Sequence, residues 1–292
     1  MSVSANRFER QVALFGSPGQ DKLRESSIAV VGFGGLGSHV VQQLAFLGVG
    51  HLSIVDPETV ELSNLNRLIG ASPSDVGQRK VDVAARLVNT IDPSIEVLCV
   101  AEGLPQAEAY DAVKAAGIVF GCVDHDGPRL VLSELCAAYE QPYFDLATEI
   151  VPGPPVAYGG RVVYSHGGNG CLSCLNELSL AEAGRYFLDE AAQVEESRLY
   201  GVPAANLGES GPSVVSLNGT VASLAVTEFM VLVTGLRQPR RLLRYYGHLS
   251  KVTVSVDPPP PDCFYCKSVY GLKERAGVER YRRESLNRGD GA

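Results

Sequence analysis

A glycine-rich turn followed by an acidic residue is the first feature of this sequence that could do chemistry. Residues 32–37 read GFGGLG, between a β-branched apolar run and a helical pattern. Such a turn lets the backbone N–H groups at a helix N-terminus face a phosphate, and an acid about 20 residues on binds a ribose. The residues concerned are Gly32, Gly34, Gly35, Gly37 and Asp56. They predict a nucleotide site, and the alternative is a tight turn without a ligand.

Two cations and an amide follow the acid. Asn64, Arg67 and Lys80 lie within 25 residues of Asp56. Attack on the α-phosphate of ATP develops negative charge, which fixed cations stabilise. An NAD-dependent dehydrogenase has little need of them, although the glycine turn alone fits either class. The alternative for each cation is an exposed surface residue that forms a weak ion pair.

Four of the seven cysteines form two Cys-x-x-Cys pairs, Cys171 with Cys174 and Cys263 with Cys266. In a reducing compartment such pairs indicate metal binding rather than disulfides. Four thiolates can make a closed tetrahedral Zn²⁺ site with a structural role, and redox use is the alternative. The remaining cysteines, Cys99, Cys122 and Cys136, fall in apolar contexts typical of buried thiols.

The elements around these residues alternate between strands and helices. Short apolar runs predict strands at 27–32, 51–55, 95–100, 118–123 and 142–146, and helical spacing predicts helices at 36–47, 80–91 and 128–139. Beyond residue 150 we expect antiparallel strands at 156–164 and 251–256, with a helix at 214–234. The sequence therefore predicts an α/β fold with a Rossmann-like doubly wound sheet, mostly parallel with antiparallel C-terminal strands, plus a structural zinc site.

Length and charge limit the function classes. The 292 residues, 45% of them hydrophobic, suffice for one large domain, which we expect over residues 1–272, with a charged excursion at 175–212 and a disordered tail at 273–292. A net charge of −8 argues against a nucleic-acid or anionic-membrane surface. We expect no apolar run that approaches the roughly 20 residues needed to span a bilayer, and a cytoplasmic protein.

Several motifs together resemble the ThiF/MoeB/E1-like family. Their order and spacing are more specific than any one of them, and they extend from about residue 7 to residue 266. They are Arg7-Phe8-Glu9-Arg10-Gln11, the glycine turn, Asp56, the segment 62–67 (LSNLNR), the segment 76–80 (VGQRK), and Cys122-Val123-Asp124.

The resemblance implies a role for each matching residue. Asp56 would hold the ribose, while Asn64, Arg67 and Lys80 would contact the phosphates. Asp124 would place Mg²⁺, and Arg10 would reach the ATP of a partner subunit in a homodimer. Arg10 could instead be an ordinary charge on a helix surface. In this family the two cysteine pairs meet around zinc.

The implied activity is ATP-dependent adenylation of the C-terminal carboxylate of a ubiquitin-like protein or sulfur carrier with a Gly-terminated tail, releasing pyrophosphate. An E2-like protein or a sulfurtransferase would take the product. Members that form a thioester or persulfide usually carry a cysteine in the excursion, and 175–212 holds none, leaving Cys122 and Cys136 as weaker candidates. Alternatives are adenylation of a peptide or a tRNA-borne carboxylate, an NAD-dependent oxidoreductase, and a scaffold that only binds nucleotide.

Overall fold

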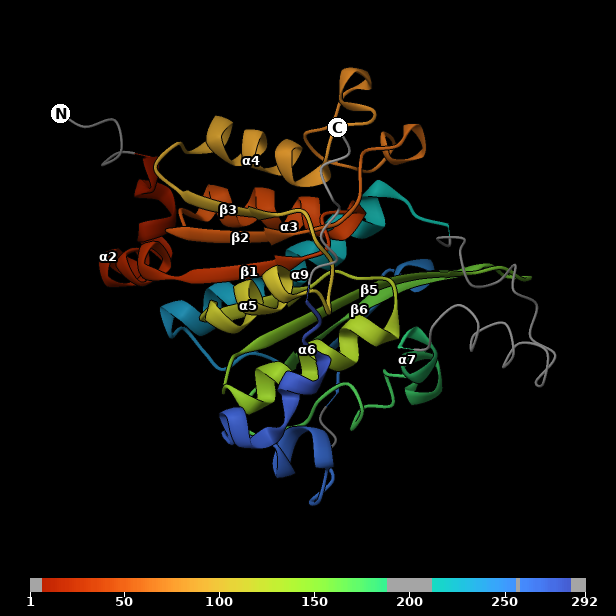
Figure 1. Ribbon diagram of the computed structural model, residues 1–292. Coiled ribbons are helices and arrows are strands. Elements are labelled where there is room, and N and C mark those ends of the chain that lie inside the picture. Colours follow the sequence, from red (N-terminus) through yellow and green to blue (C-terminus); the bar gives the residue numbers. More distant parts are fainter. Residues whose placement is uncertain (1–6, 188–211, 256–257, 285–292) are drawn as a thin grey trace, which may run out of the picture.

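One mixed sheet organises the molecule (Figure 1). The computed structural model describes residues 7–187, 212–255 and 258–284. Its eight strands lie in the order β3-β2-β1-β4-β5-β6-β7-β8, parallel from β3 to β5 and antiparallel from β5 to β8. The predicted sheet is thereby confirmed. The strands are β1 (Ser27–Val31), β2 (His51–Val55), β3 (Glu96–Val100), β4 (Ile118–Gly121), β5 (Tyr143–Val151), β6 (Ala157–Ser165), β7 (Leu242–Tyr246) and β8 (Lys251–Val254).

Helices cover both faces of this sheet and form two hydrophobic cores. On one face lie α2 (Glu9–Glu25), α3 (Gly35–Leu47), α4 (Lys80–Ile91) and α9 (Val215–Thr234). On the other lie α5 (Ala107–Ala115), α6 (Asp126–Ala138) and α7 (Leu180–Tyr186). Parallel strands covered on both faces are apolar almost throughout, which is why their sequences read as continuous β-branched runs.

The connection pattern reverses between β1 and β4, and we call the place outside the carboxyl ends of these two strands the crevice. From β1 the chain runs outward through β2 and β3, then returns to place β4 on the other side of β1. Helices α3 and α6, which follow β1 and β4, therefore lie on opposite faces. Ligands bind at the carboxyl ends of the strands at such a switch point.

Helix α9 is, by length and composition alone, long and apolar enough to cross a membrane, contrary to the expectation that no run approaches that length. In the folded chain its residues Val221, Ala225 and Phe229 are fully buried in the core that also contains α3. Its apolar composition is explained by this packing between α3 and the sheet.

The expectation of disorder from residue 273 is wrong for residues 273–284. They form two short 3-10 helices, η6 (Lys273–Ala276) and η7 (Val278–Tyr281), and Val278 is fully buried. Arg280 and the hydroxyl of Tyr281 both contact the buried carboxylate of Glu134 on α6. The charges of this segment therefore serve contacts with the domain. Residues 285–292 lie outside the described residues, as do 188–211 of the excursion.

Candidate functional site

The glycine turn joins β1 to α3 at the crevice between β1 and β4. Gly32 has φ +92°, and a Cβ there would lie 2.5 Å from the carbonyl oxygen of Cys122 after β4. A Cβ on Gly37 would overlap the carbonyl of Gly32. Only glycine satisfies both positions, so the N-terminus of α3 is held directly at the end of β1.

Asp56 lies beside this turn, as the sequence predicts. Its carboxylate is 5% exposed and accepts hydrogen bonds from the backbone N–H groups of Phe33, at 2.6 Å, and Glu58, at 2.9 Å. Burial raises the pKa of Asp56, while the charge of Lys80 and the two hydrogen bonds act against that rise. The acid at the end of β2 is thus fixed to the turn by one direct bond.

Lys80 begins α4 and is 6% exposed. Its ammonium group pairs with the carboxylate of Glu58, which is largely exposed. The charge of Lys80 also acts on the carboxylate of Asp56, where it opposes the rise in pKa that burial causes. Lys80 therefore brings a cation to the same place as Asp56.

Asn64 and Arg67 come from the loop after β2. Asn64 is buried in the short helix η1 (Leu62–Asn64), where its side-chain oxygen accepts the N–H of Glu61 at 3.1 Å. The guanidinium of Arg67 donates to the carbonyl of Ser63 at 2.6 Å, and its Cδ lies close to Gly35. Arg67 is therefore placed at the first turn of α3, and the loop brings it there from 30 residues downstream of the turn.

Asp124 follows β4 on the other side of the crevice. A Cβ on Gly32 would meet the backbone of Cys122 and Val123, so Asp124 follows a segment that lies against the glycine turn. Its side chain is 69% exposed, and His125 is 3.6 Å away. An exposed carboxylate at this place fits a ligand of Mg²⁺, which prefers oxygen.

Arg10 is the predicted site residue that does not join the others. It is exposed on α2, whose neighbouring residue Gln11 donates to the carbonyl of Leu47 at the C-terminal end of α3. The glycine turn is at the opposite end of this 13-residue helix, about 20 Å away at 1.5 Å per residue. Within its own chain Arg10 cannot reach the nucleotide site.

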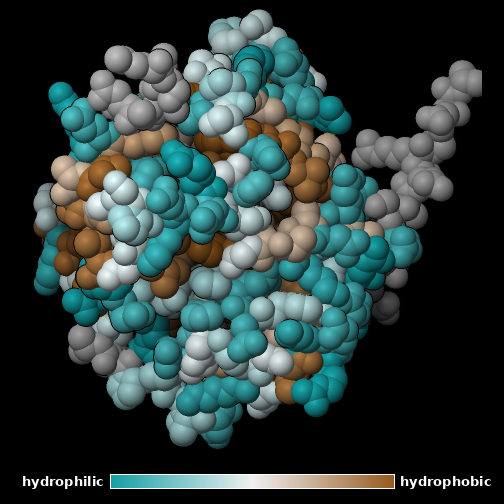
Figure 2. Space-filling model, turned by 90° about the vertical axis from the view of Figure 1, so that its left-hand side faces the viewer, coloured by the Kyte–Doolittle hydropathy of each residue, from teal (hydrophilic) through white to brown (hydrophobic). Residues whose placement is uncertain are grey.

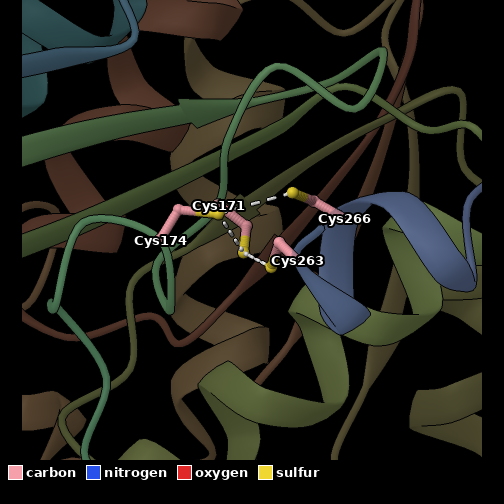
Figure 3. A group of neighbouring side chains, drawn as sticks. All are labelled: Cys171, Cys174, Cys263 and Cys266. Carbon is pink, nitrogen blue, oxygen red and sulfur yellow. Dashed lines mark hydrogen bonds between the residues drawn. The ribbon is translucent and has the colours of Figure 1, made fainter. Parts of the chain in front are cut away.

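The two cysteine pairs meet, as Figure 3 shows. The four sulfur atoms lie within 4.8 Å of one another, at 3.8 Å for Cys171–Cys174 and for Cys171–Cys263 and 3.5 Å for Cys174–Cys266. These separations exceed a disulfide bond and match the roughly 3.8 Å between thiolates bound tetrahedrally to Zn²⁺ at about 2.3 Å. The cluster fits a closed zinc site that ties the segment after β6 to the π-helical turn η5 (Phe264–Ser268).

Of the other cysteines, Cys136 is buried, and Cys99 and Cys122 are partly buried. Burial raises the pKa of Cys99, Cys122 and Cys136. Cys99 also donates to the carbonyl of Val81 at 3.3 Å. A raised thiol pKa lowers the thiolate fraction, so none of these three is activated as a nucleophile.

Asn218 is a site residue that the sequence analysis missed. It is 1% exposed in the first turns of α9, and its amide nitrogen lies so close to Gly35 that a Cβ there would overlap it. Its oxygen accepts from the hydroxyl of Thr148 at 3.0 Å, and its nitrogen donates to the hydroxyl of Ser213 at 3.0 Å. A polar residue within a long apolar helix was the available signal.

Comparisons with known proteins agree with this geometry. The family model described as the ThiF family matches residues 8–265. The maize (Zea mays) adenylyltransferase and sulfurtransferase MOCS3-1 is 31% identical over 266 residues, which cover 89% of this chain and 51% of that protein. The molybdopterin-synthase adenylyltransferase of Escherichia coli (strain K12) is 31% identical over 237 residues, covering 80% and 84% respectively.

Among solved structures, E. coli MccB in complex with N-formylated MccA has a TM-score of 0.71 at 21% identity, covering 90% of this chain and 75% of that chain. That likeness shows the fold. The chain spans between about a third and a half of the length of the MOCS3 relatives that it matches. Because the family model matches residues 8–265, which is most of its length, the chain belongs to the ThiF family.

Proposed function

We propose that this protein adenylates the C-terminal carboxylate of a ubiquitin-like protein or sulfur carrier. A carboxylate oxygen would attack the α-phosphorus of ATP, forming an acyl-phosphate bond as the bond between the α-phosphorus and the bridging oxygen breaks. Pyrophosphate would leave with the electron pair of that bond. Bound Mg²⁺ would supply charge neutralisation at the phosphates.

The observation that carries this proposal is the gathering of Asp56, Lys80 and Arg67 around one glycine turn. An acid bonded to the turn suits a ribose, and two cations beside it suit a triphosphate. A dinucleotide oxidoreductase would use the acid and the turn without needing the cations. Equilibrium titration with ATP and with NAD therefore separates the two classes, and we expect binding of ATP alone.

The surroundings of Asp124 favour a protein tail as the substrate. Asp124 is exposed beside the glycine turn, and the excursion approaches it at Ser179, whose N–H donates to Asp126. A tail ending in glycine would suit a narrow approach to the carboxylate of Asp124 because it lacks side chains. The names of the relatives, among them a molybdopterin-synthase adenylyltransferase, favour a sulfur carrier over a free peptide. The net charge of −8 disfavours tRNA.

Exchange of labelled pyrophosphate into ATP tests the reaction. We expect exchange that requires both a carrier with a free Gly-terminated carboxylate and Mg²⁺, and that is lost in Lys80→Met and Asp124→Ala. If the protein only binds nucleotide as a scaffold, Asp124→Ala will leave its function unchanged. Absence of exchange with every Gly-terminated carrier, at saturating ATP, would sink the proposal.

We also propose a homodimer in which Arg10 serves the partner's site. Arg10 cannot reach its own site, and α2 and α3 expose large apolar side chains nearby, Leu14 at 60% and Phe46 at 54%. Figure 2, which looks onto the side of the molecule that carries α2, shows apolar residues gathered among polar ones. Exposed apolar surface of this kind marks interfaces.

Mixing two inactive variants tests the shared site. Arg10→Ala and Lys80→Met, combined after subunit exchange, should regain part of the exchange activity, because one site of each mixed dimer has both residues. If the mixture stays as inactive as the separate variants although dimers form, Arg10 acts elsewhere.

The proposed location is the cytoplasm, where four reduced thiols can bind zinc.

A further inference from the structure

A chain of mostly buried charged side chains lies on the α6 face of the sheet. It consists of residues other than those assigned above to the nucleotide and zinc sites. Acidic and basic side chains alternate along it, so that three positive and three negative charges cancel. Asp145 on β5 has no exposed surface, and the side chains of Arg161 and Glu177 are 7% and 10% exposed. We call it the ion network; its members are Asp126, Arg129, Asp145, Arg161, Glu177 and Arg244.

One end of the ion network holds the loop that carries Asp124. The guanidinium of Arg129 donates to the carbonyl of Val123 at 2.8 Å and to Asp126 Oδ1 at 3.1 Å. The planar guanidinium of Arg129 thereby holds both Val123 and Asp126, which lie on either side of Asp124 in the chain. The other oxygen of Asp126 accepts the N–H of Ser179 at 2.7 Å, which ties the same loop to the excursion.

The other end reaches the zinc cluster. Arg161 pairs with Glu177 Oε2 at 2.7 Å and also donates to the carbonyl of Glu177 at 3.3 Å. The N–H of Glu177 donates at 2.8 Å to the carbonyl of Leu172, within the loop that contains Cys171 and Cys174. We call the loop that contains Cys171 and Cys174 the zinc loop. The path from the zinc loop to the loop of Asp124 consists of direct hydrogen bonds, except for the ion pair between Arg129 and Asp145, whose atoms are 3.6 Å apart.

We propose that Arg129 and the ion network are positioning residues that set the place of Asp124 and couple it to the zinc loop. This inference rests on the proposed function. Buried ion pairs add little stability over apolar residues of the same shape, so stability alone does not account for this run of charges. Placement does, because the reaction depends on the position of groups around the phosphates and small displacements are costly.

The test separates placement from stability by measuring nucleotide binding with and without Mg²⁺. The variant Arg129→Lys keeps the charge but loses the fork that holds Val123 and Asp126 together. We expect its affinity for a non-hydrolysable ATP analogue to match the wild type without Mg²⁺. The gain in affinity on adding Mg²⁺ should fall about tenfold, as when residues behind a metal ligand are changed.

A matched control is Arg237→Lys. Arg237 also places its fork on a buried carboxylate, that of Glu228 on α9, outside the ion network. We expect it to lower the thermal midpoint without changing the Mg²⁺ gain. Glu177→Gln, at the zinc end, should reduce the Mg²⁺ gain in the same direction and serves if Arg129→Lys does not fold.

The outcomes are distinct. An unchanged Mg²⁺ gain in both Arg129→Lys and Glu177→Gln, or an equal loss in Arg237→Lys, overturns the inference while leaving adenylation in place. Absence of any Mg²⁺-dependent ATP binding in the wild type would instead contradict the proposed function.

Discussion

Replacing Gly35 with alanine should damage the fold at the nucleotide site through a single neighbour, Asn218. The new Cβ would overlap the amide nitrogen of Asn218 and lie 3.3 Å from Cδ of Arg67. Asn218 is 1% exposed and has hydrogen bonds to Thr148 and Ser213, so it cannot move without breaking them.

The size of the effect follows from those contacts. Two lost hydrogen bonds cost about 2 kcal/mol, and overpacking of a buried site costs about 1 kcal/mol or more. Alanine regains about 0.5 kcal/mol as the better helix former. We expect a net loss of about 2 to 3 kcal/mol in the free energy of unfolding, which lowers the thermal midpoint by roughly 6 °C in a domain of this size.

Thermal and denaturant unfolding measure this loss, with Gly34→Ala as the control. A Cβ on Gly34 meets nothing within 4 Å, and its φ of −97° is ordinary for alanine. Its unfolding free energy should stay within about 0.5 kcal/mol of the wild type. In the double variant Gly35→Ala/Asn218→Ala the overlap is gone, so it should be no less stable than Asn218→Ala alone. Full stability in Gly35→Ala, or no coupling in this cycle, would refute the reasoning.

Three further predictions concern the rest of the chain. Arg280→Ala leaves the buried carboxylate of Glu134 without its cation and should lower the free energy of unfolding by about 2 kcal/mol. The loss is smaller than for a fully buried pair because the arginine is half-exposed. Arg282→Ala, at an exposed pair, is the control and should leave the unfolding midpoint nearly unchanged. Cys263→Ser should lower the zinc content measured by elemental analysis and lower the thermal midpoint, and undiminished zinc would count against the four-thiolate site. Because burial raises the pKa of Cys122, its thiol stays protonated at about pH 8 and should react with iodoacetamide far more slowly than an exposed cysteine; rapid labelling in the folded protein would contradict this.

Much of the fold could be predicted because buried parallel strands and amphipathic helices leave strong patterns. The helix at 80–91 and the strand at 51–55 were predicted with their observed bounds. Strand β7 was missed because Arg244 interrupts its apolar run, and that arginine is explained only by Glu177, 67 residues away in sequence. Helix α5 was missed because its buried face consists largely of alanine, which gives weak periodicity.

Site residues that belong to one short motif could be predicted from the sequence. Those whose contacts lie far away in the sequence could not. The glycine turn, Asp56 and the cysteine pairs follow from local spacing, and the structure brings each set together. A polar residue in an apolar helix could have marked Asn218, but its proximity to Gly35 joins residues 183 positions apart, and no local pattern reveals that pairing. The tail was expected to be disordered because its charges looked solvated, whereas Glu134 and other partners lie on the folded domain.

Direct detection of the acyl-adenylate tests the central claim. Intact-mass spectrometry of a Gly-terminated carrier, after one turnover with Mg·ATP, should show a carrier heavier by one adenylate, with one pyrophosphate released per adduct. The adduct should be absent with Lys80→Met and with a carrier whose C-terminus is amidated. An unmodified carrier, in a reaction where the enzyme has bound ATP and the carrier, would contradict the account.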